Sequence, residues 1–243
     1  MLNQPSSPPP KPITEVWRPE LVALPPLTPG RRCVRAFLRG LARLLTFATM
    51  RIQVTGLENL PKYGPALIVI NHLGDADVVP LLAIAPSLSP IEGIGKIELY
   101  DHWFVGPLFR LYGVIWVHRG QPDRKAIRAA LEGLAQGRLV ALAPEGRQSV
   151  IGGLEEGSDG AAFLALKSGA SIVPVALTGT ENSNIYSHLK RLRRAPVTLS
   201  VGKPFFLREQ PDRQEMIREG TRQIMETLAS LLPESYRGTY RSS

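Results

Sequence analysis

The chain has 243 residues, 44% of them hydrophobic and 21% charged, which are ordinary values for a globular protein. Cys33 is the single cysteine, so an intrachain disulfide framework and a cysteine-based zinc site are excluded. The net charge of +8 predicts an anionic partner such as a membrane surface, a nucleic acid or a phosphorylated substrate. No apolar run is long enough for a spanning helix and the N-terminus lacks the apolar core of a secretory signal, so we expect a cytosolic protein, free or attached to a membrane face.

Residues 1–30 contain 9 of the 22 prolines. Because proline fixes φ and has no N–H donor, this stretch is predicted to be an extended or disordered tail. Its apolar residues Val16, Trp17 and Leu21 leave open an alternative in which the tail docks on the domain or on lipid.

Residues 31–50 have the periodicity of a basic amphipathic helix. Apolar residues recur at helical spacing, and Arg32, Arg35, Arg39 and Arg43 form a stripe. Such a helix can lie in the headgroup layer, with its apolar face in lipid and its arginines on phosphates. The alternative is a helix packed on its own domain with a solvated basic face.

From residue 51 onward, apolar extended runs alternate with helical patterns. Strands are predicted at 52–54, 66–70, 91–95, 114–117, 139–143, 172–177 and 197–201. Helices are predicted at 75–85, 98–112, 122–136, 160–168 and 212–232. This alternation is typical of a layered α/β domain with a largely parallel or mixed sheet, which we place at 51–235, followed by a tail at 236–243.

One candidate for acid–base chemistry is His72, which directly follows the buried run at 66–70. In a parallel α/β sheet, the carboxyl ends of the strands are where catalytic groups collect. Asp77 lies one turn further on, where its carboxylate can orient the imidazole and leave the second ring nitrogen as a base. No nucleophile accompanies this pair, so the substrate could supply the hydroxyl. Taken alone, the spacing also fits a capping histidine beside a surface aspartate.

Two more groups are expected at the same edge of the sheet. Pro144-Glu145-Gly146-Arg147 follows the strand at 139–143, and Arg119 follows the run at 114–117. A guanidinium binds two phosphate oxygens at once, so Arg119, helped by Arg147, suits a phosphorylated substrate. A surface ion pair is the alternative for Arg119.

These residues together resemble the lysophosphatidic acid acyltransferase family, over about residues 52–202. The resemblance rests on Asn71-His72-x4-Asp77, Gly113 to Arg119, Pro144-Glu145-Gly146 and Val173 to Leu177, with Lys96-Ile97-Glu98-Leu99 and Gly106 before the second of these motifs. It implies transfer of a fatty acyl group from acyl-coenzyme A or acyl carrier protein to the hydroxyl of 1-acyl-glycerol-3-phosphate, giving phosphatidic acid. It also implies a glycerol-3-phosphate acyltransferase-like domain, no metal and no prosthetic group.

Carried onto this sequence, the resemblance makes His72 the general base and Asp77 its orienting partner. Arg119 would hold the phosphate of the acceptor, and Lys96 would line the same pocket. Glu145 and Gly146 would bind and position the acceptor. A substrate that lives in a bilayer also favours membrane contact by the helix at 31–50, on the cytoplasmic face of the cell membrane.

Some positions depart from the family pattern. The family often has serine at Gly74, an aromatic residue at Ala143, Thr-Arg in place of Arg147-Gln148, and a basic residue near Glu156. These departures bear on the prediction of the acceptor headgroup more than on the prediction of the reaction type.

Two alternatives remain at this point. The same reaction could use another acceptor, such as glycerol-3-phosphate, another lysolipid or an alcohol. Alternatively, the protein could be a non-catalytic binder of anionic membranes or nucleic acid, although no recognised nucleic-acid motif accompanies the charge. The basic cluster at 190–194 is either a solvated face or a contact for anionic lipid or acyl carrier protein.

Overall fold

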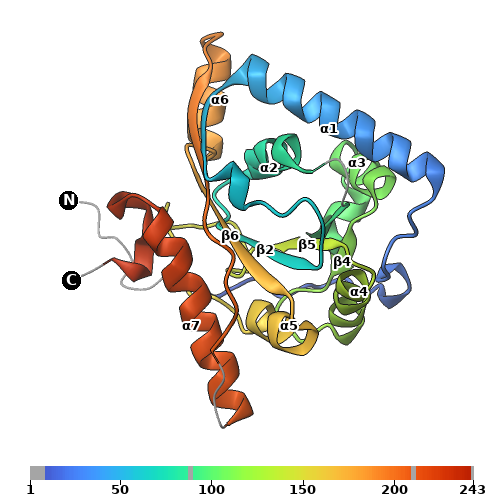
Figure 1. The fold of residues 1–243 in the computed structure, drawn as a ribbon. Helices are drawn as coiled ribbons and strands as arrows, with labels where there is room; N and C mark the ends of the chain where they lie inside the picture. The colour runs from blue at the N-terminus through green and yellow to red at the C-terminus, as the bar shows by residue number, and fades with distance from the viewer. Residues whose placement is uncertain (1–8, 87–89, 209–211, 242–243) are drawn as a thin grey trace.

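A computed structural model describes residues 9–86, 90–208 and 212–241. Seven strands form one sheet in the order β1-β7-β6-β2-β5-β3-β4 (Figure 1). They are Met50–Thr55 (β1), Ala66–Ile70 (β2), Ile91–Lys96 (β3), Ile115–Val117 (β4), Leu139–Leu142 (β5), Ser171–Thr178 (β6) and Ala195–Val201 (β7). Neighbours are parallel except β6 and β7, which are antiparallel. The expected α/β fold with a mixed, largely parallel sheet is confirmed.

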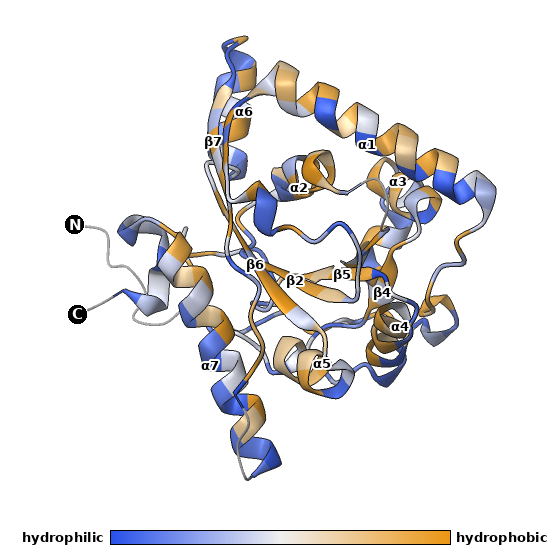
Figure 2. Ribbon diagram, in the orientation of Figure 1, coloured by the Kyte–Doolittle hydropathy of each residue, from blue (hydrophilic) through white to orange (hydrophobic). Residues whose placement is uncertain are grey.

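Helices cover both faces of this sheet (Figure 1). They are Pro29–Thr49 (α1), Val78–Ile84 (α2), Val105–Tyr112 (α3), Arg124–Ala135 (α4), Gly160–Ser168 (α5), Asn182–Lys190 (α6) and Arg213–Leu231 (α7). Helices α4, α5 and α7 pack on one face, and α2 packs on the other. Hydrophobic residues line the central strands (Figure 2), as expected for strands buried on both sides.

Strand β2 lies at the centre of the sheet, between β5 and β6. All five of its residues are buried, and they alternate between the two hydrophobic clusters on either side of the sheet. This explains why the sequence shows an uninterrupted apolar run at 66–70. The central position of β2 fixes the chain segment that follows it, which begins with Asn71 and His72. The Asn71 side chain bonds both the N–H and the C=O of Leu177 in β6, at 2.7 and 2.9 Å.

Helix α1 packs on α2 and α3, and its orientation differs from both sequence-based expectations. Three arginines of the predicted stripe face the protein. Arg35 is buried and makes a two-pronged ion pair with the fully buried Glu92, at 2.8 and 2.7 Å. Arg39 and Arg43 donate to backbone carbonyls at the end of α2 and just beyond it, where a helix leaves its last C=O groups unbonded. Arg35 and Arg39 therefore serve as contacts with the domain, whereas Arg32 and Arg43 of the stripe remain exposed.

The outer face of α1 is apolar. Its exposed large hydrophobic residues are Phe37, Leu41, Leu44, Leu45 and Phe47, with exposed fractions of 36% to 70%. A continuous exposed apolar face of this kind marks a contact with another molecule or a membrane. No helix in the described part of the chain is both long and apolar enough to cross a bilayer.

Residues 9–28, called the N-terminal strap below, run along the domain surface. The backbone N–H of Thr14 donates to the carbonyl oxygen of Arg119 at 3.0 Å. The backbone N–H of Arg18 donates to Nε2 of His118 at 2.9 Å. The Arg138 guanidinium donates to the carbonyl oxygen of Pro25. Over these residues the tail is not disordered and instead docks on the domain, the alternative left open by the sequence, because contacts with residues about 100 positions away hold the strap. Residues 1–8 lie outside the described part.

Other elements also differ from the sequence-based expectations. The helix predicted at 98–112 is split into a 3₁₀ turn, Ile97–Asp101, and α3, because the His102 ring accepts the backbone N–H groups that begin α3. Helix α6 was not predicted, although its last residue begins the basic cluster at 190–194. The expected tail at 236–243 is packed in its described part, where Leu154 exchanges backbone hydrogen bonds with Tyr236 and Thr239.

Candidate active site

Four adjacent strands end at one edge of the sheet, and each leads to a predicted site residue. His72 follows β2, Glu145 follows β5, Lys96 ends β3 and Arg119 follows β4. These strands are parallel neighbours, so their carboxyl ends lie side by side at the edge where α/β proteins place ligands. With about 4.8 Å between neighbouring strands, Glu145 starts one strand from His72, and Arg119 starts three strands, or about 14 Å, away.

The His72 imidazole is oriented by Asp77. The distance between Nδ1 and Oδ2 is 2.7 Å, and the same oxygen accepts the backbone N–H groups of Leu73 and Gly74. An ionised carboxylate only accepts hydrogen bonds, which assigns the proton to Nδ1 and leaves the lone pair on Nε2. Asp77 is buried, whereas the His72 side chain is 33% exposed. The pair therefore leaves Nε2 of His72 without a hydrogen-bond partner among the described residues.

Gly74 explains one departure from the family pattern. It lies against the chain after β6, and a Cβ atom at this position would collide with the carbonyl oxygen of Thr180. The side-chain oxygen of Asn182 accepts the next backbone N–H, that of Asp75, at 2.9 Å. The segment between His72 and Asp77 is therefore fitted closely to the start of α6, and a serine side chain has no room here.

The chain contains the His-x4-Asp spacing a second time, at His118 and Asp123. The Nδ1–Oδ2 distance is 2.6 Å, but the His118 side chain is 0% exposed. Its Nε2 accepts the N–H of Arg18, and its ring centroid lies 4.2 Å from that of Trp17. Both ring nitrogens are engaged inside the protein, so this pair holds the N-terminal strap and has no free base. The repeated His-x4-Asp spacing is the sequence signal that could have identified this second pair.

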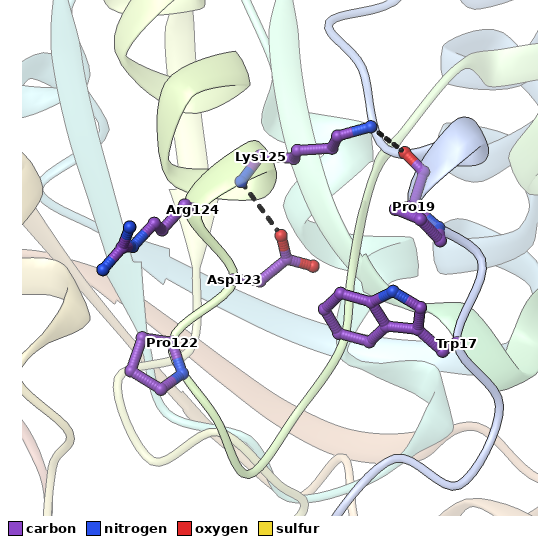
Figure 3. A pocket seen from close by; sticks show the side chains of 6 residues that line it. All are labelled: Trp17, Pro19, Pro122, Asp123, Arg124 and Lys125. Carbon is purple, nitrogen blue, oxygen red and sulfur yellow. Dashed lines mark hydrogen bonds between the residues drawn. The ribbon is translucent and has the colours of Figure 1, made fainter.

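A cavity of about 190 Å³ lies beside this second pair (Figure 3). Its lining residues are Trp17, Pro19, Pro122, Asp123, Arg124 and Lys125. The Lys125 ammonium bonds the carbonyl oxygen of Pro19, and the backbone N–H of Lys125 bonds the Asp123 carboxylate. The cavity is smaller than typical ligand sites of roughly 300–1,000 Å³, and none of the residues predicted to act on a substrate lines it. It belongs to the surface on which the N-terminal strap rests.

Glu145 is fully buried beside the first pair. One carboxylate oxygen accepts the backbone N–H of His72, and the other accepts that of Glu155, both at 2.9 Å. Burial raises the pKa of Glu145 to about 7. The backbone N–H of Ser149 also donates to the carbonyl oxygen of His72 at 2.7 Å. Glu145 thus joins the two loops after β2 and β5, which sets the backbone position from which the His72 ring projects.

Gly146 and Arg147 continue this loop. Gly146 has φ of +73°, which glycine adopts without strain. Arg147 is buried, and its guanidinium pairs with Glu155 at 2.6 Å and donates to the carbonyl oxygens of Pro9 and Pro10. The expected helper in phosphate binding therefore has its donors bonded within the protein, where they connect the loop to the N-terminal strap.

Arg119 is partly buried near the N-terminal strap. One guanidinium nitrogen lies 3.2 Å from Oε1 of Glu98, which also accepts the Thr14 hydroxyl. The Nε of Arg119 and Oε2 of Glu98 are buried without a hydrogen-bond partner in the described residues. Lys96, at the end of β3, makes no hydrogen bond or ion pair with its ammonium group in the same part of the chain. These two cations thus keep donor capacity for an anionic group.

No group of three or more His, Cys, Asp or Glu side chains placed to hold a metal ion occurs among the described residues. The arrangement at the strand ends consists of an oriented imidazole, a buried carboxylate that fixes its backbone, and two cations further along the edge. Such a set can deprotonate a hydroxyl on a phosphorylated molecule.

Comparison with known proteins identifies the family of this chain. Residues 51–178 match the family model described as Acyltransferase. The chain belongs to the acyltransferase family. This match includes all of the strand-end residues described above.

Several curated acyltransferases are similar to the chain. A 1-acyl-sn-glycerol-3-phosphate acyltransferase of Borreliella burgdorferi is 35% identical over 141 residues, covering 57% of this chain and 55% of that protein. A chloroplastic 1-acyl-sn-glycerol-3-phosphate acyltransferase of Arabidopsis thaliana is 31% identical over 156 residues, covering 63% and 43%. The chain thus spans about half the length of these relatives.

The fold also has a relative among solved structures. The crystal structure of the 1-acyl-sn-glycerophosphate acyltransferase PlsC from Thermotoga maritima aligns with a TM-score of 0.62 and 24% identity, covering 83% of this chain and 80% of that one. This likeness shows that the two chains share the fold.

Proposed function

We propose that the protein transfers a fatty acyl group from a thioester donor, acyl-coenzyme A or acyl carrier protein, to the hydroxyl of 1-acyl-glycerol-3-phosphate, producing phosphatidic acid. The observation that carries this proposal is the His72–Asp77 pair at the strand-end edge. No hydroxyl or thiol group of the described residues bonds the Nε2 of His72, so the hydroxyl that it would deprotonate belongs to the substrate. The names of the curated relatives support this acceptor.

In the proposed reaction, Nε2 of His72 accepts the proton of the acceptor hydroxyl as its oxygen attacks the thioester carbonyl carbon. Asp77 stabilises the imidazolium that forms, because its carboxylate oxygen accepts a hydrogen bond from Nδ1–H while the proton stays on the ring. The tetrahedral adduct then collapses, the carbon–sulfur bond breaks, and the departing sulfur takes the proton from Nε2. The products are an ester and a free thiol, and the enzyme needs no metal or prosthetic group for these steps.

The remaining residues are assigned to binding and positioning. Arg119 and Lys96 would hold the acceptor phosphate, because their donors are not fully used and a phosphomonoester carries about −1.5 to −2. Glu145 and Gly146 would position His72 and the acceptor-facing loop. Arg147, with Glu155 as its partner, would maintain that loop.

The protein is proposed to work as a peripheral enzyme on the cytoplasmic face of the cell membrane. The exposed apolar face of α1 supports this placement, because a helix can bury such a face in the headgroup and acyl boundary. The substrate and the product would both reside in the same bilayer.

The experiment is acyl transfer from radiolabelled acyl-coenzyme A to lysophosphatidic acid in vesicles, with wild type beside His72→Ala. We expect turnover in the wild type and a loss of about 10²- to 10⁴-fold in the variant. Glycerol-3-phosphate and other lysolipids are tested as competing acceptors, and acyl carrier protein as an alternative donor. Equal rates for His72→Ala and wild type would contradict the assigned base, and no transfer with any donor or acceptor would favour a non-catalytic binding protein.

A further inference from the structure

The turn between α6 and β7 has an unusual composition. Four basic residues surround one leucine in residues 190–194, called the basic turn below: Lys190, Arg191, Leu192, Arg193 and Arg194. All five are exposed, and Leu192 is exposed to 97%, the highest value among the exposed large hydrophobic residues of the described chain. Leu192 therefore points away from the protein at the tip of a projecting turn.

The backbone of Leu192 is also strained. Its φ of +52° makes it the one non-glycine residue with positive φ in the described ranges. A residue with a Cβ atom adopts this conformation at an energetic cost, and such positions concentrate at functional sites. A glycine or asparagine would fit this turn more easily, so neither packing nor turn geometry explains the leucine.

The basic turn adjoins the outer face of α1. The guanidinium carbon of Arg194 lies 4.5 Å from the centre of the Phe47 ring, and Phe47 is 67% exposed. Ala195, the first residue of β7, pairs with Met50 directly after α1. Figure 1 shows α6 beside the end of α1 where β1 begins. The two segments form one continuous surface, with apolar residues along the helix and cations at its end.

The distribution of charge indicates what this surface binds. Along α1, Arg35 is buried in its ion pair with Glu92, and Arg39 and the exposed Arg43 each donate to a backbone carbonyl near the end of α2. In the basic turn no side chain forms an ion pair with the described residues, so its cations are available to an external anion. An acidic protein or a nucleic acid would complement the cations but leave Leu192 in water. An anionic bilayer complements both, because it offers phosphates at its surface and an apolar layer beneath them.

We propose that the basic turn is a membrane anchor, in which Leu192 enters an anionic lipid bilayer and the surrounding basic side chains bind the lipid phosphates. The outer face of α1 then lies on the same bilayer. This inference deepens the proposed function, because it rests on an enzyme that acts at a membrane. It assigns the electrostatic part of docking to the basic turn and the apolar part mainly to α1.

The direct test places an environment-sensitive fluorophore at the tip of the turn. Leu192→Cys is made in a Cys33→Ser background, since Cys33 is exposed, and Ser230→Cys on α7 is the matched control. We expect a blue shift at position 192 with phosphatidylglycerol vesicles and none at position 230. No shift at 192, with a shift from a label at Phe37→Cys on α1, would overturn the anchor while leaving docking by α1 intact.

Substitutions test the two parts of the anchor separately. Leu192→Asn keeps a residue that tolerates positive φ and removes only the apolar group, so we expect about tenfold weaker binding to anionic vesicles. Replacing Lys190, Arg191 and Arg193 by glutamine is expected to weaken that binding by about a hundredfold, at about fivefold per charge, with no change on phosphatidylcholine vesicles. Unchanged vesicle binding in both variants, or loss of acyl carrier protein binding alone, would overturn the proposal.

Transfer to a short-chain acceptor dissolved in buffer separates this inference from the proposed function. We expect the variants of the basic turn to match wild type in this assay. Absence of transfer by the wild type would count against the proposed reaction, while the fluorescence shift would still report on the anchor.

Discussion

The two His-x4-Asp pairs provide an internal comparison, because they share spacing and hydrogen bonding but differ in burial. The His72 side chain is 33% exposed, and its loss leaves Asp77 with two backbone donors. We therefore expect His72→Ala to reduce transfer by about 10²- to 10⁴-fold and to lower the free energy of unfolding by about 1 kcal/mol or less.

His118→Ala is expected to lower stability strongly and to leave transfer almost unchanged. The substitution removes a fully buried ring, leaves a cavity beside Trp17, and takes away the acceptor of the Arg18 N–H and one donor to Asp123. The cavity and the unpaired polar groups together should lower the free energy of unfolding by about 3–4 kcal/mol. For a chain of this size, that loss corresponds to a decrease in Tm of about 10 °C. Transfer per folded molecule should remain close to wild type.

Urea denaturation followed by tryptophan fluorescence measures the free energy of unfolding of both variants. Acyl transfer at 15 °C, where His118→Ala is still folded, measures their activity. The reasoning would be refuted if His118→Ala lost transfer at unchanged stability, or if His72→Ala were the more destabilised of the two variants.

Three further predictions concern residues around the site. Gly74→Ser should lower stability by about 1–3 kcal/mol, because the Cβ collides with the Thr180 carbonyl, and urea midpoints that match wild type would contradict this. Glu92→Gln breaks the buried ion pairs with Arg35 and Arg138 and should cost about 3–5 kcal/mol in denaturant unfolding; a cost below 1 kcal/mol would show that these buried pairs are not what stabilises this part of the domain. Burial raises the pKa of Glu145 to about 7, so the protonated form is favoured in the folded state, and this contribution is present below about pH 4.5 and lost as the pH rises through 7. From pH 5 to 8 the wild type should therefore lose about 2 kcal/mol more unfolding free energy than Glu145→Gln, and an equal or smaller loss would contradict the shifted pKa.

The parts of the fold that were predicted from sequence are those set by short-range patterns. The run at 66–70 is apolar throughout because β2 is buried on both faces. The sequence therefore indicated directly both that this segment is a strand and where it lies. His72 and Glu145 follow such runs, and parallel neighbours bring their ends together. The local spacing of His72 and Asp77 allowed their hydrogen bond, and the family resemblance favoured it over a capping histidine beside a surface aspartate.

The parts that were not predicted depend on contacts between distant residues. Helical periodicity in α1 separates an arginine face from an apolar face, but it does not say which one packs against the domain. The answer lies in Glu92, 57 positions after Arg35, and in the carbonyl groups at the end of α2. The partner of Arg18 is His118, 100 positions away, and no local pattern in a proline-rich stretch indicates such a contact.

The prolines of the N-terminal strap have a consequence for where this protein can be cut. Pro9 and Pro10 have no N–H groups, so this stretch of backbone offers only acceptors, and it lies against a guanidinium that offers only donors. A shortened chain beginning at residue 30 would leave Arg147 and His118 without these partners. A boundary chosen by composition alone would thus remove part of the folding unit, and a shortened protein that precipitates would say nothing about its catalytic capacity.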